Sequence, residues 1–401
     1  MIELPSARAV LHPVDEPFPP GAHDTRSAVT IGRLLGIAVA VAFVTGMISH
    51  LHQHPLGWLD LPSRPVWGYR VTQGLHVIAG IAAIPLLLAK LWVVYRHLFV
   101  WPPVRDAAHA VERLLLVPLV AGLLCEVTSG LLNVVRWYPW PFFFPRVHYG
   151  VAWMVVGSLA AHLAFKWWAV CGRIPEPVAA QPVLGDEPLA SPGAAGAAGA
   201  AGAPDADRRA LLIGALASTA AVTLATAGQT VPALHAISAL KPRDPLAGPQ
   251  GLAVNRTASA AGVRSAALDP GWQLTLAAGD RVTRFTLADL VAMPQQVARL
   301  PLACVEGWSA EAEWTGVPLR ALLSAAGVPA DAHLRAVSLE RNWLYANSPL
   351  NPAQAWDPLT LLALRLDGEP LDLDHGYPLR LIGPNRPGVH QTKWLERIEV
   401  A

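Results

Sequence analysis

The chain has 401 residues, of which 53% are hydrophobic and 15% are charged, and its 30 basic residues nearly balance 29 acidic ones. Soluble domains carry roughly 25% charged residues, so this composition argues against a wholly soluble protein. A net charge of +1 argues against a nucleic-acid-binding protein, which would present a basic face.

Four apolar stretches before residue 172 are long enough to cross a membrane, because a helix that spans the roughly 30 Å hydrocarbon core needs about 20 mainly apolar residues. These stretches are Val29–Ile48, Leu75–Tyr95, Val111–Val135 and Val147–Val170. The sequence therefore predicts a cytoplasmic N-terminal tail (1–28) and an all-α transmembrane bundle of four helices (29–171).

The segment that follows, 172–207, is rich in Pro, Ala and Gly and is typical of a flexible linker. It leads into an Ala-rich apolar stretch at Ala210–Gln229, which predicts a fifth transmembrane helix over 208–230. Arg208 and Arg209 precede this stretch directly. Paired arginines before a modest apolar run resemble a twin-arginine (Tat) export signal, and they are equally typical of the cytoplasmic end of a transmembrane helix.

The distribution of Lys and Arg near the span ends predicts the orientation of the chain. The excess falls on the side that carries the N-terminus, and this side is cytoplasmic by the positive-inside rule. Five spans then place the residues after about 231 outside the cytoplasm. We expect a protein of the bacterial inner membrane with its C-terminal domain on the periplasmic face.

Ten of the 14 histidines precede residue 171. His148 and His162 are 14 residues apart, which places them about 40° apart around one helix and about 21 Å apart along its axis. Such a pair suits one or two b-type haems stacked across the bilayer, each held by histidines of facing helices. His76 lies at the depth of His148 and is its expected partner. For His162 the alternatives remain open: His109, His97 and His50.

Residues 250–401 have the composition of a soluble, mixed α+β domain without a regular βαβ alternation. A β-hairpin is predicted at Trp272–Leu276 and Arg281–Phe285, and short helices at Leu287–Met293 and Leu319–Ala326. Further strands are predicted at Ala298–Val305, Arg335–Glu340, Leu359–Arg365, Leu379–Ile382 and Leu395–Val400.

Cys304 follows an apolar strand and precedes a turn-like break. A lone cysteine in a strand is ordinarily a small buried hydrophobic residue. The residues that accompany it in this domain favour a cofactor site instead. Cationic side chains that converge with backbone amides form an anion site suited to a phosphate, and a soft thiolate beside it suits a transition metal. The cationic and polar candidates are Asn255, Arg256, His375, Arg380, Arg386 and Lys393.

Two resemblances follow from these motifs. Gln73-Gly-Leu-His76-Val, Phe144-Pro-Arg-Val-His148-Tyr and His162 resemble the four-helix di-haem b-type cytochromes that exchange electrons with quinones, over roughly residues 28–171. The likeness departs at Lys90, which stands where a further histidine would follow His76 by one haem spacing.

Over residues 250–401 the chain resembles the sulfite-oxidase-fold molybdopterin enzymes, in particular the branch of the periplasmic protein-methionine-sulfoxide reductase. The motifs are Ala303-Cys-Val-Glu-Gly-Trp-Ser309, Trp314-Thr-Gly-Val-Pro-Leu319, His375-Gly-Tyr-Pro-Leu-Arg380 and Lys393-Trp394. The resemblance implies that Cys304 is the molybdenum ligand. It also implies that the pterin and its phosphate are held by Asn255, His375, Arg380, Gln391, Thr392 and Lys393.

The sequence thus predicts a membrane-bound molybdopterin-dependent oxidoreductase that exchanges electrons between quinone, haem b and molybdenum. Reduction of a sulfoxide or N-oxide is favoured over sulfite oxidation, because no Gly-Asn-Arg-Arg run follows Cys304. The competing hypothesis is a membrane-tethered binding or sensor module without enzymatic activity, in which Cys304 is merely buried.

Overall fold

A computed structural model of the chain describes residues 25–98, 104–170, 203–341 and 344–400. Nearly all of the predicted N-terminal tail and most of the predicted linker lie outside these residues, as do Cys171 and the side chain of His97.

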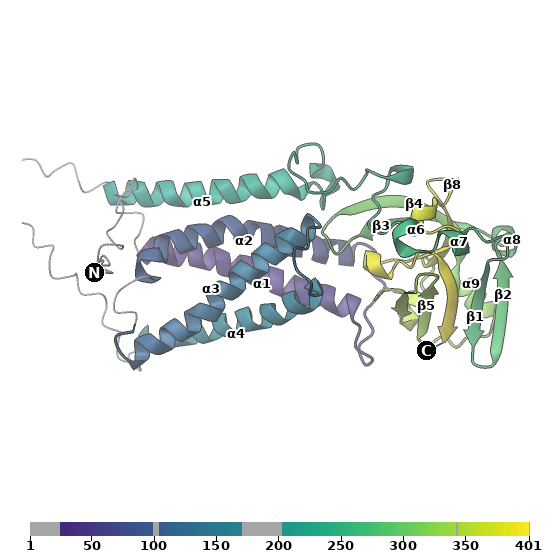
Figure 1. Cartoon of the computed structure of the whole chain (residues 1–401), viewed down its shortest axis with the longest axis horizontal. Helices are drawn as coiled ribbons and strands as arrows, with labels where there is room; N and C mark the ends of the chain where they lie inside the picture. Colours follow the sequence, from purple (N-terminus) through teal and green to yellow (C-terminus); the bar gives the residue numbers. More distant parts are fainter. Residues whose placement is uncertain (1–24, 99–103, 171–202, 342–343, 401) are drawn as a thin grey trace, which may run out of the picture. The chain divides into compact units, whose positions relative to one another are not determined.

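Five long helices account for the five predicted spans. They are α1 (Thr25–Gln53), α2 (Gly68–Leu98), α3 (Ala107–Val134), α4 (Phe144–Val170) and α5 (Ala203–Ala227) (Figure 1). Each is long and apolar enough to cross a membrane. Helices that are apolar on all sides need an apolar environment. The five helices are therefore confirmed. Their passage across a membrane and their orientation in it stay predictions.

The chain divides into two compact units that do not follow the order of the sequence. The first comprises Met1–Ala38, Ala82–Ser129 and Phe142–Ala221, and it is helical wherever the structure describes regular elements. The second comprises Val39–Ile81, Gly130–Pro141 and Val222–Ala401. The second unit therefore contains the C-terminal domain together with parts of α1 and α2, the α3–α4 connection and the end of α5.

Two five-stranded sheets form the framework of the C-terminal domain. One has the order β2-β1-β10-β5-β6, and the other has the order β3-β4-β7-β8 with β9 paired to β7. The strands are β1 (Gln273–Ala278), β2 (Arg281–Thr286), β3 (Gln296–Ala303), β4 (Ser309–Pro318), β5 (Leu334–Ser338), β6 (Asn347–Leu350), β7 (Leu361–Leu366), β8 (Glu369–Pro370), β9 (Arg380–Ile382) and β10 (Leu395–Val400).

Short helices and turns connect these strands. They are η3 (Pro232–Leu234), η4 (Pro249–Gly251), α6 (Ala258–Ala261), α7 (Arg264–Ala267), α8 (Leu287–Ala292), α9 (Leu319–Ala325), α10 (Pro352–Ala355), η5 (Leu373–His375) and η6 (Gly388–His390). Of the named strand pairs, only β1 and β10 run parallel, so the expected mixed α+β architecture without βαβ alternation is confirmed.

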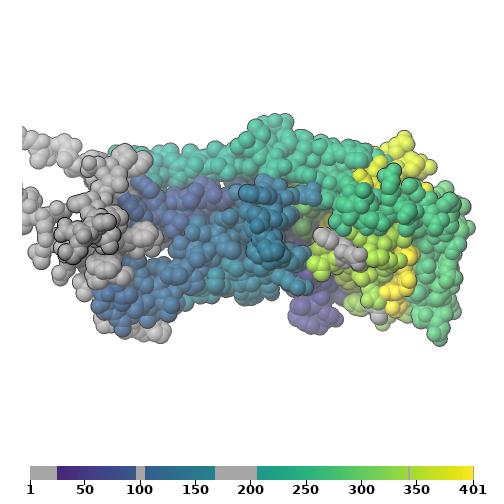
Figure 2. All heavy atoms as spheres, viewed as in Figure 1, coloured from purple at the N-terminus to yellow at the C-terminus, as the bar shows by residue number. Residues whose placement is uncertain are grey.

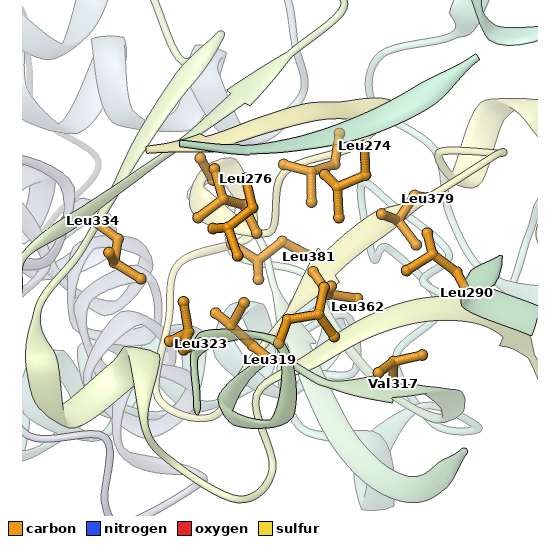
Figure 3. Packing of buried hydrophobic residues seen from close by; sticks show 14 of the residues in the cluster. Leu274, Leu276, Leu290, Val317, Leu319, Leu323, Leu334, Leu362, Leu379 and Leu381 are labelled. Carbon is orange, nitrogen blue, oxygen red and sulfur yellow. The ribbon is translucent and has the colours of Figure 1, made fainter. Parts of the chain in front are cut away.

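A leucine-rich core holds the domain together. Figure 3 shows the side chains of β1, α9, β7 and β9 gathered into one cluster, in which Leu274, Leu319 and Leu362 are fully buried. Burial of each such side chain contributes about 1.5 to 3 kcal/mol. A second cluster around Trp314, Leu300 and Ile382 lies on the β3-β4-β7 sheet and includes Cys304.

The segment between α5 and β1 lies on the face of the molecule drawn in Figure 2 (teal to green) and packs against the C-terminal domain. Gln250 donates hydrogen bonds to the carbonyls of Leu366 and Pro370, and Leu252 is buried in the second cluster. This segment carries Asn255, so it brings a polar side chain from outside the sheets toward Cys304.

Candidate active site around Cys304

Cys304 begins a tight loop between two antiparallel strands. β3 ends at Ala303 and β4 begins at Ser309, and we call residues 304–309 the Cys304 loop. The amide of Cys304 donates to the carbonyl of Trp308 at 2.9 Å, and the amide of Gly307 donates to the carbonyl of Cys304 at 3.0 Å. Gly307 has a φ of 93°, which favours glycine and lets the loop close on itself.

The sulfur of Cys304 is buried, and two N–H donors face it. Asn255 Nδ2 lies 2.8 Å from Sγ, and the amide of Glu306 lies 3.5 Å from it. Burial raises the pKa of the Cys304 thiol well above its usual range, and the Glu306 carboxylate raises it further. The two donors oppose this rise because they stabilise the thiolate. A bound metal ion would complete the change, since a coordinating thiol is deprotonated.

Arg136 reaches this site from the connection between α3 and α4. Its Nε lies 3.3 Å from Glu306 Oε1, and its Nη2 donates to the carbonyl of Asn255 at 3.0 Å. Burial raises the pKa of Glu306, and the guanidinium of Arg136 opposes that rise. Sequence reasoning missed this role of Arg136, since 170 positions separate it from Glu306 and no local motif links the two.

Four other cationic candidates lie around backbone carbonyls, and we call them the cationic cluster. Lys393 Nζ donates to the carbonyls of Arg256 and Asp374, at 2.5 and 2.9 Å. Arg380 Nη1 donates to the carbonyl of His375 at 3.1 Å, and His375 Nε2 lies 2.7 Å from the carbonyl of Pro249. The structure thus brings Arg256, His375, Arg380 and Lys393 together.

The charges of this cluster are poorly compensated. Burial lowers the pKa of Lys393 to about 7, with Arg380 lowering it further, and burial lowers the pKa of Arg380 to about 9. His375 has a pKa of about 4, again mainly because of burial. Arg256 is the exception, since it forms an ion pair with Glu340 at 2.6 Å. A buried anion would relieve the remaining desolvation penalty.

Arg386 occupies a different environment. Its guanidinium donates to Gln354 Oε1, Ser348 Oγ and the carbonyls of Pro349 and His390. These bonds hold Arg386 in the segment that follows β9, and its buried Nε, like that of Arg380, has no hydrogen-bond partner among the described residues. Gln391 is likewise engaged, because its amide exchanges two hydrogen bonds with Gly383, each of 2.8 Å.

Several buried polar atoms lack a hydrogen-bond partner in the part of the chain that the structure describes. They include Arg380 Nε, Thr392 Oγ1 and Ser309 Oγ. Buried polar groups are nearly always paired, so such a set calls for a partner that the protein itself does not supply. A pterin cofactor with polar ring atoms and a phosphate offers acceptors and donors for these groups. The residues present therefore fit a molybdopterin group.

The helix histidines have partners that bear on haem binding. In the first unit, His148 Nδ1 lies 3.2 Å from Glu126 Oε2 and 3.3 Å from Ser129 Oγ. In the second unit, His76 Nδ1 lies 2.8 Å from the carbonyl of Ala42. Both rings therefore have an oxygen partner at Nδ1, and metal-ligating histidines usually have this arrangement.

The remaining haem candidates are less uniform. Among the described residues, the buried Nδ1 of His162 has no hydrogen-bond partner. The ring nitrogens of His109 lie 3.2 Å from the amide nitrogen of Arg105 and from Nε of Arg113, and a neutral imidazole can accept from only one of these donors. The rings of His50 and His54 have their centroids 4.7 Å apart and are tilted by 48° to each other. Among the described residues, no group of three or more His, Cys, Asp or Glu is arranged to hold a metal ion.

Comparison with known proteins assigns the C-terminal part of the chain. Residues 261–401 match the family of the oxidoreductase molybdopterin binding domain. The C-terminal domain is a molybdopterin-binding oxidoreductase domain. Asn255, Arg256 and Arg136 lie outside the matched residues, so parts of the site come from elsewhere in the chain.

Three curated relatives illustrate the range of this domain. The chain is 34% identical over 118 residues to the putative protein-methionine-sulfoxide reductase subunit YedZ1 of Azospira oryzae, which is 29% of this chain and 43% of that protein. It is 35% identical to the protein-methionine-sulfoxide reductase catalytic subunit MsrP of Gluconobacter oxydans, over 25% and 36% of the two chains. It is 28% identical to the mitochondrial sulfite oxidase of Drosophila melanogaster, over 32% and 27%. The chain thus spans less than half the length of each of these relatives.

Proposed function

We propose that this protein is a membrane-bound oxidoreductase that reduces a sulfoxide at a molybdenum centre, with electrons delivered through haem b from a membrane quinol. The contact between Asn255 and the sulfur of Cys304, with the buried cations of the cationic cluster, carries this proposal. Cys304 would bind the metal, while Arg380, Lys393 and Thr392 would hold the pterin and its phosphate. When bound, the cofactor supplies the oxygen-atom transfer.

A sulfoxide substrate is favoured by the names of two relatives, a putative subunit and a catalytic subunit of protein-methionine-sulfoxide reductases. Reduction of a sulfoxide consumes two electrons and two protons and yields a thioether and water. The chain must therefore supply both electrons at a site that the substrate also reaches. Oxidation of sulfite would reverse the direction of electron flow, because it releases two electrons. One relative is named a sulfite oxidase, so this direction is the alternative to be tested.

Haem binding is supported by the Nδ1 contacts of His148 and His76. An oxygen partner at Nδ1 fixes the tautomer and the orientation of the ring, as is usual for histidines that ligate a metal. Apolar helix surfaces around both residues supply the environment that a b-type haem needs. We propose His148 and His76 as ligands of an outer haem and His162 as a ligand of an inner one.

The C-terminal domain would lie on the periplasmic face of the inner membrane. Five apolar helices before the domain support this placement, together with the excess of Lys and Arg on the side of the N-terminus. Arg208 and Arg209 lie inside α5, close to its start, so they would stand at its cytoplasmic end. This position suits either an export signal or a helix anchor.

The deciding experiment compares purified wild-type protein with Cys304→Ser. We expect about one molybdenum and one or two b-type haems per wild-type chain, by metal analysis and the pyridine-haemochrome spectrum. With a reduced viologen dye, the wild type should turn over methionine sulfoxide, and Cys304→Ser should lose turnover while it keeps its haem spectrum. Absence of molybdenum from the wild type would favour the membrane-tethered binding module.

A further inference from the structure

The Cys304 loop is held by residues from outside the two sheets. Gln73 of α2 donates from Nε2 to the carbonyl of Val305 at 2.9 Å. Thr230, which follows α5, donates from Oγ1 to the carbonyl of Gly307 at 2.5 Å. The neighbouring Gln229 accepts a hydrogen bond from the amide of Ser309 at 2.8 Å. All of these residues belong to the second compact unit.

Van der Waals contact at Gly307 adds to these hydrogen bonds. A Cβ atom at this position would approach Val77 Cγ2 to 2.7 Å, so the backbone of the loop lies directly against α2. Val77 is one helical turn beyond Gln73 and shares its side of the helix. One face of α2 therefore contacts two of the three residues that follow Cys304.

The side chain of Gln73 is itself fixed in orientation. Its Oε1 accepts a hydrogen bond of 2.7 Å from Ser49 Oγ, and Ser49 Oγ lies 3.2 Å from the hydroxyl of Tyr69. Gln73, Ser49 and Tyr69 are all buried. The carbonyl of Val305 can only accept a hydrogen bond, so the amide nitrogen of Gln73 must face it, and the Ser49 hydroxyl donates to the remaining Oε1.

We propose that Gln73 and Thr230 are positioning residues for Cys304. By holding the Cys304 loop in place, the start of α2 and the segment after α5 keep the thiol buried and oriented for the cofactor. The amides and carbonyls of the Cys304 loop have few partners within the sheets, because the chain leaves β3 at Ala303 and joins β4 only at Ser309. The side chains of Gln73 and Thr230 donate hydrogen bonds to two carbonyls of the loop, in place of the strand pairing that begins again at Ser309. The reactive residue of the C-terminal domain would then depend on α2 and on the end of α5.

The proposal predicts the reactivity of the thiol itself. Opening of the Cys304 loop must precede alkylation of a buried sulfur, so the labelling rate reports the population of the open loop. Loss of one buried hydrogen bond should raise that population about tenfold, which corresponds to about 1.4 kcal/mol. This prediction concerns the cofactor-free chain and is independent of the proposed function.

The test uses the full-length chain, purified in detergent from cells that make no molybdopterin. Iodoacetamide labelling of Cys304 is followed by peptide mass spectrometry, which separates it from the other cysteines. Gln73→Leu and Thr230→Val remove the two donors at nearly constant volume. Thr72→Val and Thr226→Val are matched controls, because both hydroxyls bond only to carbonyls of their own helix.

We expect about tenfold faster labelling in each test variant and wild-type rates in both controls. Equal rates in all five proteins would overturn the proposal, as would equal acceleration by the controls. A second readout is the molybdenum content of the variants made in cofactor-producing cells, and this readout rests on the proposed function. If the wild type lacks molybdenum but the labelling rates differ as expected, the proposed function fails and the positioning role stands.

Discussion

Asn255 forms a bridge between Cys304 and the far side of the same loop. Its Nδ2 donates to the cysteine sulfur at 2.8 Å, while its Oδ1 accepts a hydrogen bond of 3.1 Å from Trp308 Nε1. The indole donor thus orients the amide, so that the sulfur faces an N–H group. Both ends of the Cys304 loop are fixed by one side chain from a segment that precedes the sheets.

Asn255→Leu removes both bonds and should weaken binding of the cofactor. Outer-shell partners of metal ligands typically contribute about 10- to 100-fold in metal affinity, so we expect a large loss of molybdenum per chain. Metal analysis of the purified variant measures this loss. Asn347→Leu, at an exposed position of β6, should retain the wild-type content. Full molybdenum in Asn255→Leu would mean that the bridge has no part in cofactor binding.

Lys393 should make the stability of the cofactor-free protein depend on pH. Its pKa is about 7 in the folded chain, against about 10.4 for an unperturbed lysine. Between these values the unfolded chain binds a proton that the folded chain does not, so stability increases as the pH rises. The contribution is fully present above about pH 10.4 and is lost as the pH falls through about 7.

Lys393→Met should therefore flatten the increase in melting temperature between pH 7 and pH 9. Differential scanning fluorimetry of cofactor-free protein measures both curves. A bound phosphate would keep Lys393 protonated, so the cofactor-loaded wild type should also show the flatter curve. Lys241→Met serves as the control and should follow the wild type. Parallel curves for wild type and Lys393→Met would contradict the assignment of a buried, neutral lysine.

His148→Ala should remove one haem per chain, which the pyridine-haemochrome spectrum counts directly. Glu126→Gln leaves an oxygen at the position that contacts Nδ1 but removes the charge, so the haem should remain and its reduction potential should rise. Redox titration of the haem absorbance measures the shift. His235→Ala, whose ring pairs with Asp244 outside the long helices, should change neither quantity. An unchanged haem count in His148→Ala would exclude this ligand.

Arg208→Lys combined with Arg209→Lys separates the two interpretations of the paired arginines. An export signal needs arginine itself, whereas a helix anchor needs only positive charge. If the pair is an export signal, the C-terminal domain should stay in the cytoplasm. Protease added to spheroplasts should then cut the wild-type domain and spare the variant. Equal cutting of both proteins would leave the anchor as the explanation.

Local patterns in the sequence located most of the elements. The hairpin of β1 and β2 follows from alternation around Gly279, and α9 ends where Gly327 adopts a φ of 69°. The prediction omitted β4, although burial alternates along it. Ala310, Ala312 and Trp314 are buried, whereas Glu311 and Glu313 are exposed. Two-residue periodicity was present there, beginning where the expected turn after Cys304 ended, at Ser309.

The site was only partly accessible from the sequence. The sequence offered Arg386 as a cationic candidate without its partners, Gln354 and Ser348, which only the fold brings to the guanidinium. The contacts of Gln73 and Arg136 with the Cys304 loop could not be found by motif, since the partners lie 232 and 170 positions away. Contacts of this separation are created by the tertiary fold, and no short-range pattern encodes them.

The ion pair of Arg64 with Asp357 bears on how the molecule is assembled. Two bonds of 2.9 Å join the α1–α2 connection to a carboxylate that is almost fully buried. During synthesis, Arg64 leaves the ribosome about 290 residues before its partner exists. The helix ends are thus made before the sheets, and Gln73 and Arg64 meet their partners, Val305 and Asp357, only after the C-terminal domain has been synthesised.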